Sequence, residues 1–241
     1  WLWMLYSFGL SGLLCDDMGV GKTHQAMALL AAVAHVHKKK PRYLIICPTS
    51  LIWHWREKIQ SFLPSFSLFY YVGSDRSLDD FFSGQYDIFL TTYGIWRNEF
   101  QALRQIPFEI ALFDELQIAK NHFSRIWSAL SQVNAVMRIG LTGTPIENRL
   151  RELKALFDLI IPGYLPEDSL FRELYIKTRD EPSMVANRCL LLSRYVRPFI
   201  LRRRKVDVLQ DLPEKVEEKY RVDLLGEQAT LYRQVASQQG G

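Results

Sequence analysis

The sequence predicts an α/β fold in which a mainly parallel sheet carries helices on both faces. Three observations support this prediction. Short, β-rich apolar runs alternate with helical patterns over the first 160 residues, which is the rhythm of α/β proteins. The runs are almost entirely apolar, as expected for strands covered on both faces. Polar clusters follow five of them, and in such sheets ligands bind at the carboxyl ends of the strands.

The predicted elements follow one another in a regular order. The strands are GLLC (12–15), RYLIICP (42–48), SLFYYVG (67–73), YDIFLTTYG (86–94), EIALFDE (109–115) and MRIGLTG (137–143). A helix is predicted over residues 22–36, where KTHQAMALLAAVAHV is apolar on most sides and therefore buried. Residues 51–62 form a predicted amphipathic helix, because their apolar side chains recur at spacings of four and three. These side chains are Leu51, Trp55, Ile59 and Phe62.

The pattern changes after about residue 162. Residues 161–183 contain turns and helical stretches without a strand candidate, and the basic run RPFILRRRK (197–205) follows. A strand is predicted at VEEKYRVDL (216–224) and a last helix at GEQATLYRQVASQ (226–238). We therefore expect a lobe over residues 1–162 and, over residues 163–241, a C-terminal helical elaboration that leads toward a further domain.

Composition limits the possible classes of protein. With 241 residues, 48% of them hydrophobic, the chain can bury a sizeable core. No apolar run reaches the roughly 20 residues of a membrane helix, so we expect no membrane partner. We also expect the chain to be monomeric. Three well-separated cysteines favour a reducing, intracellular compartment, which is the cytoplasm (nucleoid) of a prokaryote or the nucleus of a eukaryote. A net charge of +4 permits a nucleic-acid partner without requiring one, since basic runs are usually solvated surface.

The stretch CDDMGVGKTHQ (15–25) has the composition of a phosphate-binding turn. Glycines let backbone N–H groups surround phosphate oxygens, a lysine reaches the terminal phosphates, and a Ser or Thr hydroxyl holds Mg²⁺. Gly19, Gly21, Lys22 and Thr23 supply these groups at the required spacing. Asp16 stands where the strict pattern has a glycine. The alternative is a polar surface turn that happens to contain Gly-Lys.

Acidic and hydroxyl residues follow two later strands. Asp114 is placed to coordinate Mg²⁺, and Glu115 to orient and polarise a water molecule. The competing interpretation is that an acid after a strand caps the next helix. Thr142 and Thr144 fit either a relay that senses the γ-phosphate or an ordinary turn before a proline-initiated helix.

Taken together, the motifs resemble those of the first motor lobe of SWI/SNF-type ATPases, double-stranded DNA translocases of the second helicase superfamily. The matching segments, in family order, are DDMGVGKTHQ, CPTSLIWHW, LTTYG, DELQIAKN and LTGTPIENRLREL, and RPFILRRRKVDVLQDLPEK is similar to the segment leading toward the second lobe. The resemblance covers the chain to about residue 220. It implies a three-layer, RecA-like P-loop NTPase fold, with ATP and Mg²⁺ as cofactors.

The resemblance also implies roles at the matching positions. Lys22, Asp114 and Glu115 would be catalytic, with Thr23 and Asp114 at the metal. Nucleotide contacts would come from Asp17, Met18, Gly19, Val20, Gly21, Lys22, Thr23, His24, Gln25 and Gln117. The DNA backbone would be contacted by Pro48, Thr49, Ser50, Thr92, Tyr93 and Gly94. Coupling between the two sites would fall to Thr142, Gly143 and Thr144, and residues 202–205 would meet DNA or the second lobe.

The implied partners are double-stranded DNA, a second RecA-like lobe of the same protein, and remodelled complexes such as nucleosomes, RNA polymerase or other DNA-bound proteins. We expect the family's adenine-reading glutamine to precede Trp1, and the second lobe with its arginine fingers to follow Gly241. Three alternatives stay open. They are a strand-separating helicase or restriction-system motor, a P-loop NTPase without a nucleic-acid partner, and a degenerate binding module without enzymatic activity.

Overall fold

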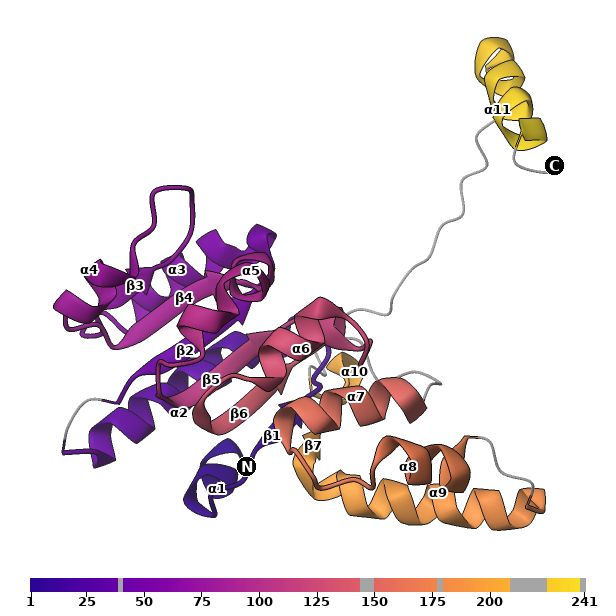
Figure 1. The fold of residues 1–241 in the computed structure, drawn as a ribbon, viewed down its shortest axis with the longest axis horizontal. Coiled ribbons are helices and arrows are strands. Elements are labelled where there is room, and N and C mark those ends of the chain that lie inside the picture. The colour runs from indigo at the N-terminus through magenta and orange to yellow at the C-terminus, as the bar shows by residue number, and fades with distance from the viewer. Residues whose placement is uncertain (39–40, 144–149, 177–179, 209–224, 239–241) are drawn as a thin grey trace. The chain divides into compact units, whose positions relative to one another are not determined.

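Seven parallel strands form the central sheet of the protein, in the order β3-β4-β2-β5-β6-β1-β7 (Figure 1). The computed structural model describes residues 1–38, 41–143, 150–176, 180–208 and 225–238. The strands are β1 (Gly12–Leu14), β2 (Tyr43–Cys47), β3 (Leu68–Tyr70), β4 (Ile88–Thr92), β5 (Phe108–Asp114), β6 (Ala135–Leu141) and β7 (Ile200–Leu201). Because every pairing is parallel, the carboxyl ends of the strands share one edge.

Helices cover both faces of this sheet. Successive side chains of a strand point to opposite sides, so apolar strands give the sheet two apolar faces. In β2, Leu44 and Ile46 pack into one apolar cluster, whereas Ile45 and Cys47 pack into the other. The second cluster is completed by α1 (Leu2–Ser7), α2 (Lys22–Val36) and α3 (Ile52–Phe62). The first is completed by α4 (Leu78–Ser83), α5 (Tyr93–Leu103), α6 (Arg125–Ser131), α7 (Leu150–Ile160), α8 (Asp168–Tyr175) and α9 (Pro182–Val196). This is the predicted three-layer arrangement.

The predicted elements agree closely with the structure. All six predicted strands are present, and α2 has the predicted bounds. The helix predicted over residues 51–62 begins one residue later, after the short 3₁₀ helix η1 (Thr49–Leu51). Trp55 and Ile59 are buried as its period requires, but Phe62 is 54% exposed. The ring of Phe62 instead meets the His24 ring edge-on, with centroids 4.7 Å apart.

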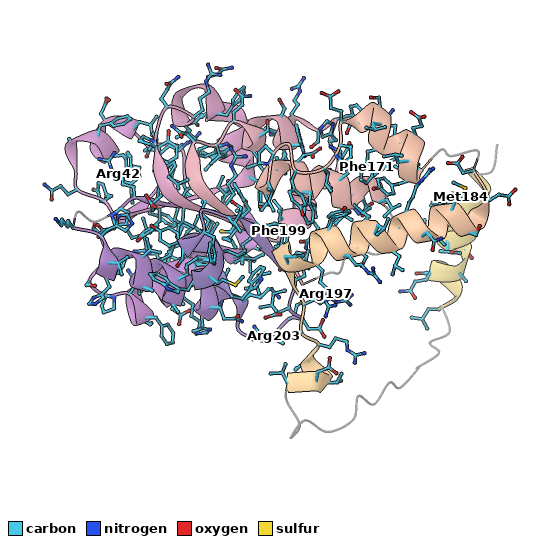
Figure 2. All side chains as sticks on the ribbon, turned by 90° about the horizontal axis from the view of Figure 1, so that it is seen from below. Arg42, Phe171, Met184, Arg197, Phe199 and Arg203 are labelled. Atoms are coloured by element: carbon cyan, nitrogen blue, oxygen red, sulfur yellow. The ribbon has the colours of Figure 1, made fainter. Side chains whose placement is uncertain are left out.

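One strand was not predicted. β7 lies inside the basic run 197–205 and pairs in parallel with β1, where Leu13 faces Ile200 and Leu14 faces Leu201. It follows η3 (Arg197–Phe199) and precedes α10 (Lys205–Val208). In Figure 2, Phe199 and Arg203 lie on either side of this strand. The basic run was described without a strand, so Ile200–Leu201 is a strand that the sequence pattern did not reveal.

By Cα packing, Trp1–Val208 form one compact unit and Leu209–Gly241 a second. The boundary at residue 162 stays an interpretation of the sequence pattern, since β7 ties the later segment back to the sheet. The second unit contains the predicted terminal helix as α11 (Gly226–Gln238). The strand predicted at 216–224 lies outside the described residues. Within the described ranges, no helix combines the length and the apolar character needed to cross a membrane.

Candidate functional site

The turn between β1 and α2 has the backbone of a phosphate-binding loop. Gly19 and Gly21 adopt φ values of +88° and +89°, in the left-handed region that favours glycine. Gly21 is the residue before α2 and has no side chain to cap it. The first N–H groups of the helix therefore point out at its N-terminus, where an anion is favoured.

Lys22, the first residue of α2, holds this turn together from inside. Its Nζ donates to the backbone oxygens of Asp16, at 2.6 Å, and Asp17, at 3.2 Å. A Cβ placed on Gly143 would lie 3.4 Å from Lys22 Nζ and 3.0 Å from Met18 Cγ. The turn after β1 and the end of β6 are therefore in contact around the lysine ammonium.

Asp114 ends β5, two strands away from β1 in the sheet, and only 6% of it is exposed. Its Oδ2 accepts a hydrogen bond of 2.8 Å from Trp55 Nε1, and its Oδ1 accepts one of 3.0 Å from the N–H of Glu115. Burial raises the pKa of the Asp114 carboxyl, although the Trp55 bond and the nearby Lys22 charge oppose this. The Lys22 charge is the smallest of these influences on the pKa of Asp114, and the hypothesis that both residues serve one phosphate site stays a prediction.

The helix-cap alternative for Asp114 finds no support. The short helix after β5 is η2 (Leu116–Ala119), and the residue at its cap position is Glu115, whose side chain makes no capping bond. Asp114 Oδ1 accepts instead from the adjacent N–H of Glu115. The carboxylate of Asp114 is therefore held at the strand end rather than used to begin a helix.

Glu115 has a strained backbone. With φ 52° and ψ 49°, it is the non-glycine residue with positive φ in the described ranges. Left-handed backbone at such a residue costs energy and concentrates at functional sites. Glu115 Oε2 accepts from Gln117 Nε2, and Gln117 Oε1 accepts from Thr142 Oγ1 at 2.8 Å. A polar chain therefore connects the end of β5 to the end of β6. Thr144, the last of the predicted coupling residues, lies outside the described residues.

The two predicted DNA-contact segments leave the sheet side by side. Cys47 at the end of β2 pairs with Thr92 at the end of β4, so residues 48–50 and 93–94 emerge together. Thr49, Ser50 and Gly94 are exposed. Their exposure leaves these three positions accessible to a phosphate backbone.

Of the remaining three positions, Pro48 is half-buried, and Thr92 and Tyr93 are buried with partners inside the fold. Thr92 Oγ1 caps α5 by accepting from the N–H of Ile95 at 3.3 Å. Tyr93 is buried, and its hydroxyl donates to the backbone oxygen of Asp114 at 2.7 Å. Tyr93 therefore joins the predicted DNA segment to the residue predicted to hold the metal.

The other predicted nucleotide residues differ in what their side chains do. Thr23 and Val20 are half-buried, whereas Met18 is 65% exposed. Gln25 donates to Asp16 Oδ2 at 3.2 Å. Asp17 Oδ2 accepts from the N–H of Lys205 at 2.9 Å. The side chains of Gln25 and Asp17 thus form hydrogen bonds that stabilise the turn. The His24 ring instead packs against Phe62, so it connects α2 with α3.

Sequence reasoning missed three residues that organise the site. They are Asp16, which is fully buried, Arg203, which binds it, and Trp55, which binds Asp114. Asp16 carried a signal, because it replaces a glycine of the strict phosphate-loop pattern and an acid there needs a partner. Arg203 and Trp55 lie 187 and 59 positions from their partners and carried no local signal.

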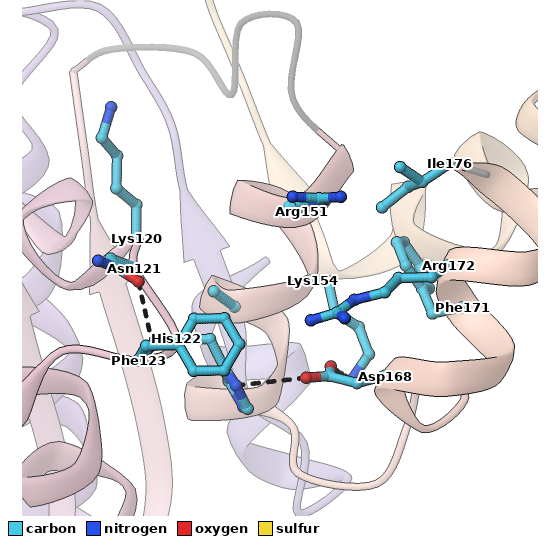
Figure 3. A pocket seen from close by; sticks show the side chains of 11 residues that line it. Lys120, Asn121, His122, Phe123, Arg151, Lys154, Asp168, Phe171, Arg172 and Ile176 are labelled. Carbon is cyan, nitrogen blue, oxygen red and sulfur yellow. Dashed lines mark hydrogen bonds and ion pairs between the residues drawn. The ribbon is translucent and has the colours of Figure 1, made fainter.

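A separate cavity of about 180 Å³ lies between residues 120–123, which follow η2, and the helices α7 and α8 (Figure 3). His122, Asp158 and Asp168 bring three possible metal-ligating atoms within 4.8 Å of one another there. Lys154 forms ion pairs with both carboxylates, at 3.5 Å to Asp168. Asp168 also lies 3.3 Å from His122 Nδ1. The lysine charge already compensates the acids, so this cluster is an internal ion-pair network.

Comparison with known proteins agrees with this geometry. The family model described as "SNF2-related domain" matches residues 1–240. The chain is 38% identical over 257 residues to the Arabidopsis thaliana TATA-binding protein-associated factor BTAF1, covering 97% of this chain and 12% of that protein. It is 31% identical over 255 residues to the Candida albicans chromatin-remodeling ATPase INO80, covering 99% of this chain and 18% of the relative.

Among solved structures, the Sulfolobus solfataricus SWI2/SNF2 ATPase core in complex with dsDNA matches with a TM-score of 0.76 and 31% identity, over 99% of this chain and 50% of that one. The present chain therefore spans half of that core and less than a fifth of the two curated relatives. The fold is the RecA-like fold of these ATPase cores, as predicted. The chain belongs to the SNF2-related domain family.

Proposed function

We propose that this chain is the first motor lobe of a SWI/SNF-type, DNA-dependent ATPase that translocates on double-stranded DNA. One observation carries the proposal: the turn with Lys22 and the ends of β5 and β6 lie at the carboxyl edge of one parallel sheet, and Thr49 and Ser50 are exposed after β2 at the same edge. A nucleotide site and a surface accessible to DNA backbone thus share one rigid frame. The family match and the DNA-bound archaeal neighbour support the same assignment.

The residues present fit ATP and Mg²⁺. The left-handed glycines leave room for close backbone approach to phosphates, and a Cβ at Gly143 would lie only 3.0 Å from Met18 Cγ, next to the Lys22 ammonium. Asp114 is a desolvated carboxylate with a raised pKa, which a cation would stabilise. Thr23 and Asp114 would hold the ion, and Mg²⁺ supplies charge neutralisation on the phosphates when bound.

Each residue has a defined chemical task in this proposal. The N–H groups at the start of α2 and Lys22 orient the phosphates and withdraw charge from them. Glu115 orients and polarises the attacking water. The chain from Glu115 through Gln117 to Thr142 passes the state of the site to the end of β6. Tyr93 links the same site to the DNA-contact segment.

In the full-length protein we infer that nucleotide binding closes a second RecA-like lobe onto this one. Backbone contact suits a motor that moves over any sequence, because phosphates carry no sequence information. The remodelled complexes would be DNA-bound proteins, among which we include nucleosomes and RNA polymerase. Relatives named as TATA-binding protein-associated factors add transcription-factor complexes to that class. The compartment would be nucleus or nucleoid.

The test is the ATPase rate of the full-length protein with and without duplex DNA. Stimulation by DNA is expected. A rate that DNA leaves unchanged would favour the P-loop NTPase without a nucleic-acid partner. Displacement of a triplex strand without duplex unwinding would support the translocase over the strand-separating helicase, and unwinding of a labelled duplex would reverse that choice.

A further inference from the structure

The buried carboxylate of Asp16 is held almost entirely by one distant residue. Asp16 lies two residues after the end of β1, where the phosphate-binding turn begins, and it is 0% exposed. Arg203 donates to it from Nε, at 3.1 Å to Oδ2 and 3.2 Å to Oδ1, from Nη2, and from its backbone N–H at 2.9 Å to Oδ1. A forked guanidinium on a carboxylate is a strong and geometrically specific pair.

The chain around Arg203 continues this contact in both directions. Leu201 O accepts from the N–H of Cys15 at 2.7 Å, and Arg203 O accepts from the N–H of Asp17 at 3.0 Å. Beyond them, the N–H of Lys205 donates to Asp17 Oδ2 at 2.9 Å. Residues 200–205 thus lie alongside residues 13–17 as an extension of the β7–β1 pairing.

The nucleotide helix is the third member of this arrangement. Gln25, in the first turn of α2, donates to Asp16 Oδ2 at 3.2 Å and accepts from Arg203 Nη2 at 2.6 Å. The three side chains form a closed triangle between the turn, the helix and the segment that follows β7. Each of the three side chains therefore contacts both of the others.

Asp16 transmits this contact to the lysine through its own backbone. The same residue whose carboxylate binds Arg203 offers its carbonyl oxygen to Lys22 Nζ at 2.6 Å. A shift of Arg203 would therefore displace the carbonyl that positions Lys22. It would also leave a buried, uncompensated negative charge beside a site for anionic phosphates, where it would repel them.

We propose that Arg203 is a positioning residue that couples the nucleotide-binding turn to the segment 200–208, so that nucleotide binding and the docking of this segment stabilise each other. The proposal rests on the proposed function, because it assumes that the turn binds nucleotide. Coupling between sites is reciprocal. The segment 200–208 begins with β7, an edge strand of the sheet, so this contact connects the nucleotide state to that edge.

Amide hydrogen exchange of the full-length wild-type protein, with and without Mg²⁺ and ATPγS, tests the coupling without any mutation. ATPγS should slow exchange in residues 200–208 as well as in the turn. Slowed exchange in the turn with unchanged exchange in 200–208 would overturn the coupling and leave the proposed function standing. No effect in either segment, with no ATPγS binding, would overturn both.

Variants then assign the coupling to Arg203. Arg203→Ala should weaken ATPγS binding by about 5-fold to 150-fold, the usual range of allosteric coupling, and remove the protection of 200–208. Arg203→Lys keeps the charge but not the fork and should fall between. Arg104→Ala is the control, because Arg104 is an exposed arginine that donates to Gln132, outside the turn and outside 200–208. Equal losses in the Arg203 and Arg104 variants, or wild-type affinity in Arg203→Ala, would contradict the assignment.

Discussion

The indole N–H of Trp55 donates a 2.8 Å hydrogen bond to Asp114 Oδ2, and both side chains are buried. Trp55 belongs to α3, which follows the predicted DNA-contact residues 48–50, and Asp114 ends β5 at the nucleotide site. With the Tyr93 bond to the Asp114 carbonyl, each of the two predicted DNA segments is connected to the residue predicted to hold Mg²⁺. The predicted nucleotide and DNA regions are thus linked within one lobe.

Trp55→Phe should raise the Mg²⁺ concentration needed for ATPase activity. The substitution replaces the indole by a phenyl ring, which is still aromatic but has no N–H donor. It therefore removes a hydrogen bond to a charged group, worth about 1.5–3 kcal/mol of folding stability. Loss of such a supporting bond typically weakens metal binding by about 10-fold to 100-fold. Mg²⁺ titration of the ATPase rate measures the effect. Trp96→Phe is the control, since Trp96 is also buried but donates to the Ala129 carbonyl, away from the site. An unchanged Mg²⁺ requirement in Trp55→Phe would count against the link.

Asp16→Asn should lower stability at neutral pH by about 1.5–3 kcal/mol, because it removes the charged partner of Arg203. Burial alone would raise the pKa of Asp16, but the bonds from Arg203 and Gln25 hold it below its ordinary value of 3.8. A lowered folded pKa stabilises the protein above pH 3.8 and loses that contribution as the pH falls through the folded value. The stability difference between wild type and variant, from urea unfolding, should therefore shrink below about pH 3.8. A difference that stays constant would contradict the ion pair.

Asp114 should show the opposite pH dependence. Burial raises its folded pKa above 3.8, so the folded protein binds the proton more tightly than the unfolded chain, and stability rises as the pH falls toward 3.8. Asp114→Asn cannot take up this proton. As the pH is lowered from neutral to about 4, the stability of wild type relative to Asp114→Asn should increase. The same urea series measures this difference. A relative stability that decreases over this range would refute the desolvated carboxylate.

The isolated chain of 241 residues should bind nucleotide weakly and hydrolyse it little. In related phosphoryl transfer, arginine fingers contribute about 10³-fold to 10⁵-fold in rate, and we expect them on the second lobe. Fluorescent-nucleotide titration and a phosphate-release assay with duplex DNA measure both properties. Robust DNA-stimulated turnover by the isolated chain would show that this lobe contains a complete catalytic site.

The sequence was sufficient to predict the sheet, whereas the sharing of one site by Lys22 and Asp114 stays a prediction. Buried parallel strands are continuous apolar runs, and their carboxyl ends share an edge, so local patterns determine which residues converge. It was not sufficient for β7, a two-residue strand inside an arginine-rich run that is specified only by its pairing with β1. Likewise, Phe62 fitted the apolar period of α3, but it is the last residue of that helix and its side chain is exposed.

The long-range bonds were beyond sequence reasoning for a related physical reason. The partners of Trp55 and Arg203 depend on tertiary approach, and no spacing along the chain encodes it. Asp16 shows what a sequence can still reveal. An acid stands there in place of the glycine of the phosphate-loop pattern, directly after an apolar strand, and a buried carboxylate requires a partner for its charge. The run 202–205 was expected to meet DNA or the second lobe, and the structure commits Arg203 to the phosphate turn instead.

The most direct test of the central claim is the DNA-stimulated ATPase rate of the full-length protein carrying Lys22→Ala or Glu115→Gln. Both residues border one pocket in this account, so each variant should lose the stimulated rate. Arg104→Ala, which removes an exposed cation at the far end of α5, should keep it. Turnover at the wild-type level in both site variants would contradict a shared ATP site built from the turn after β1 and the acids after β5.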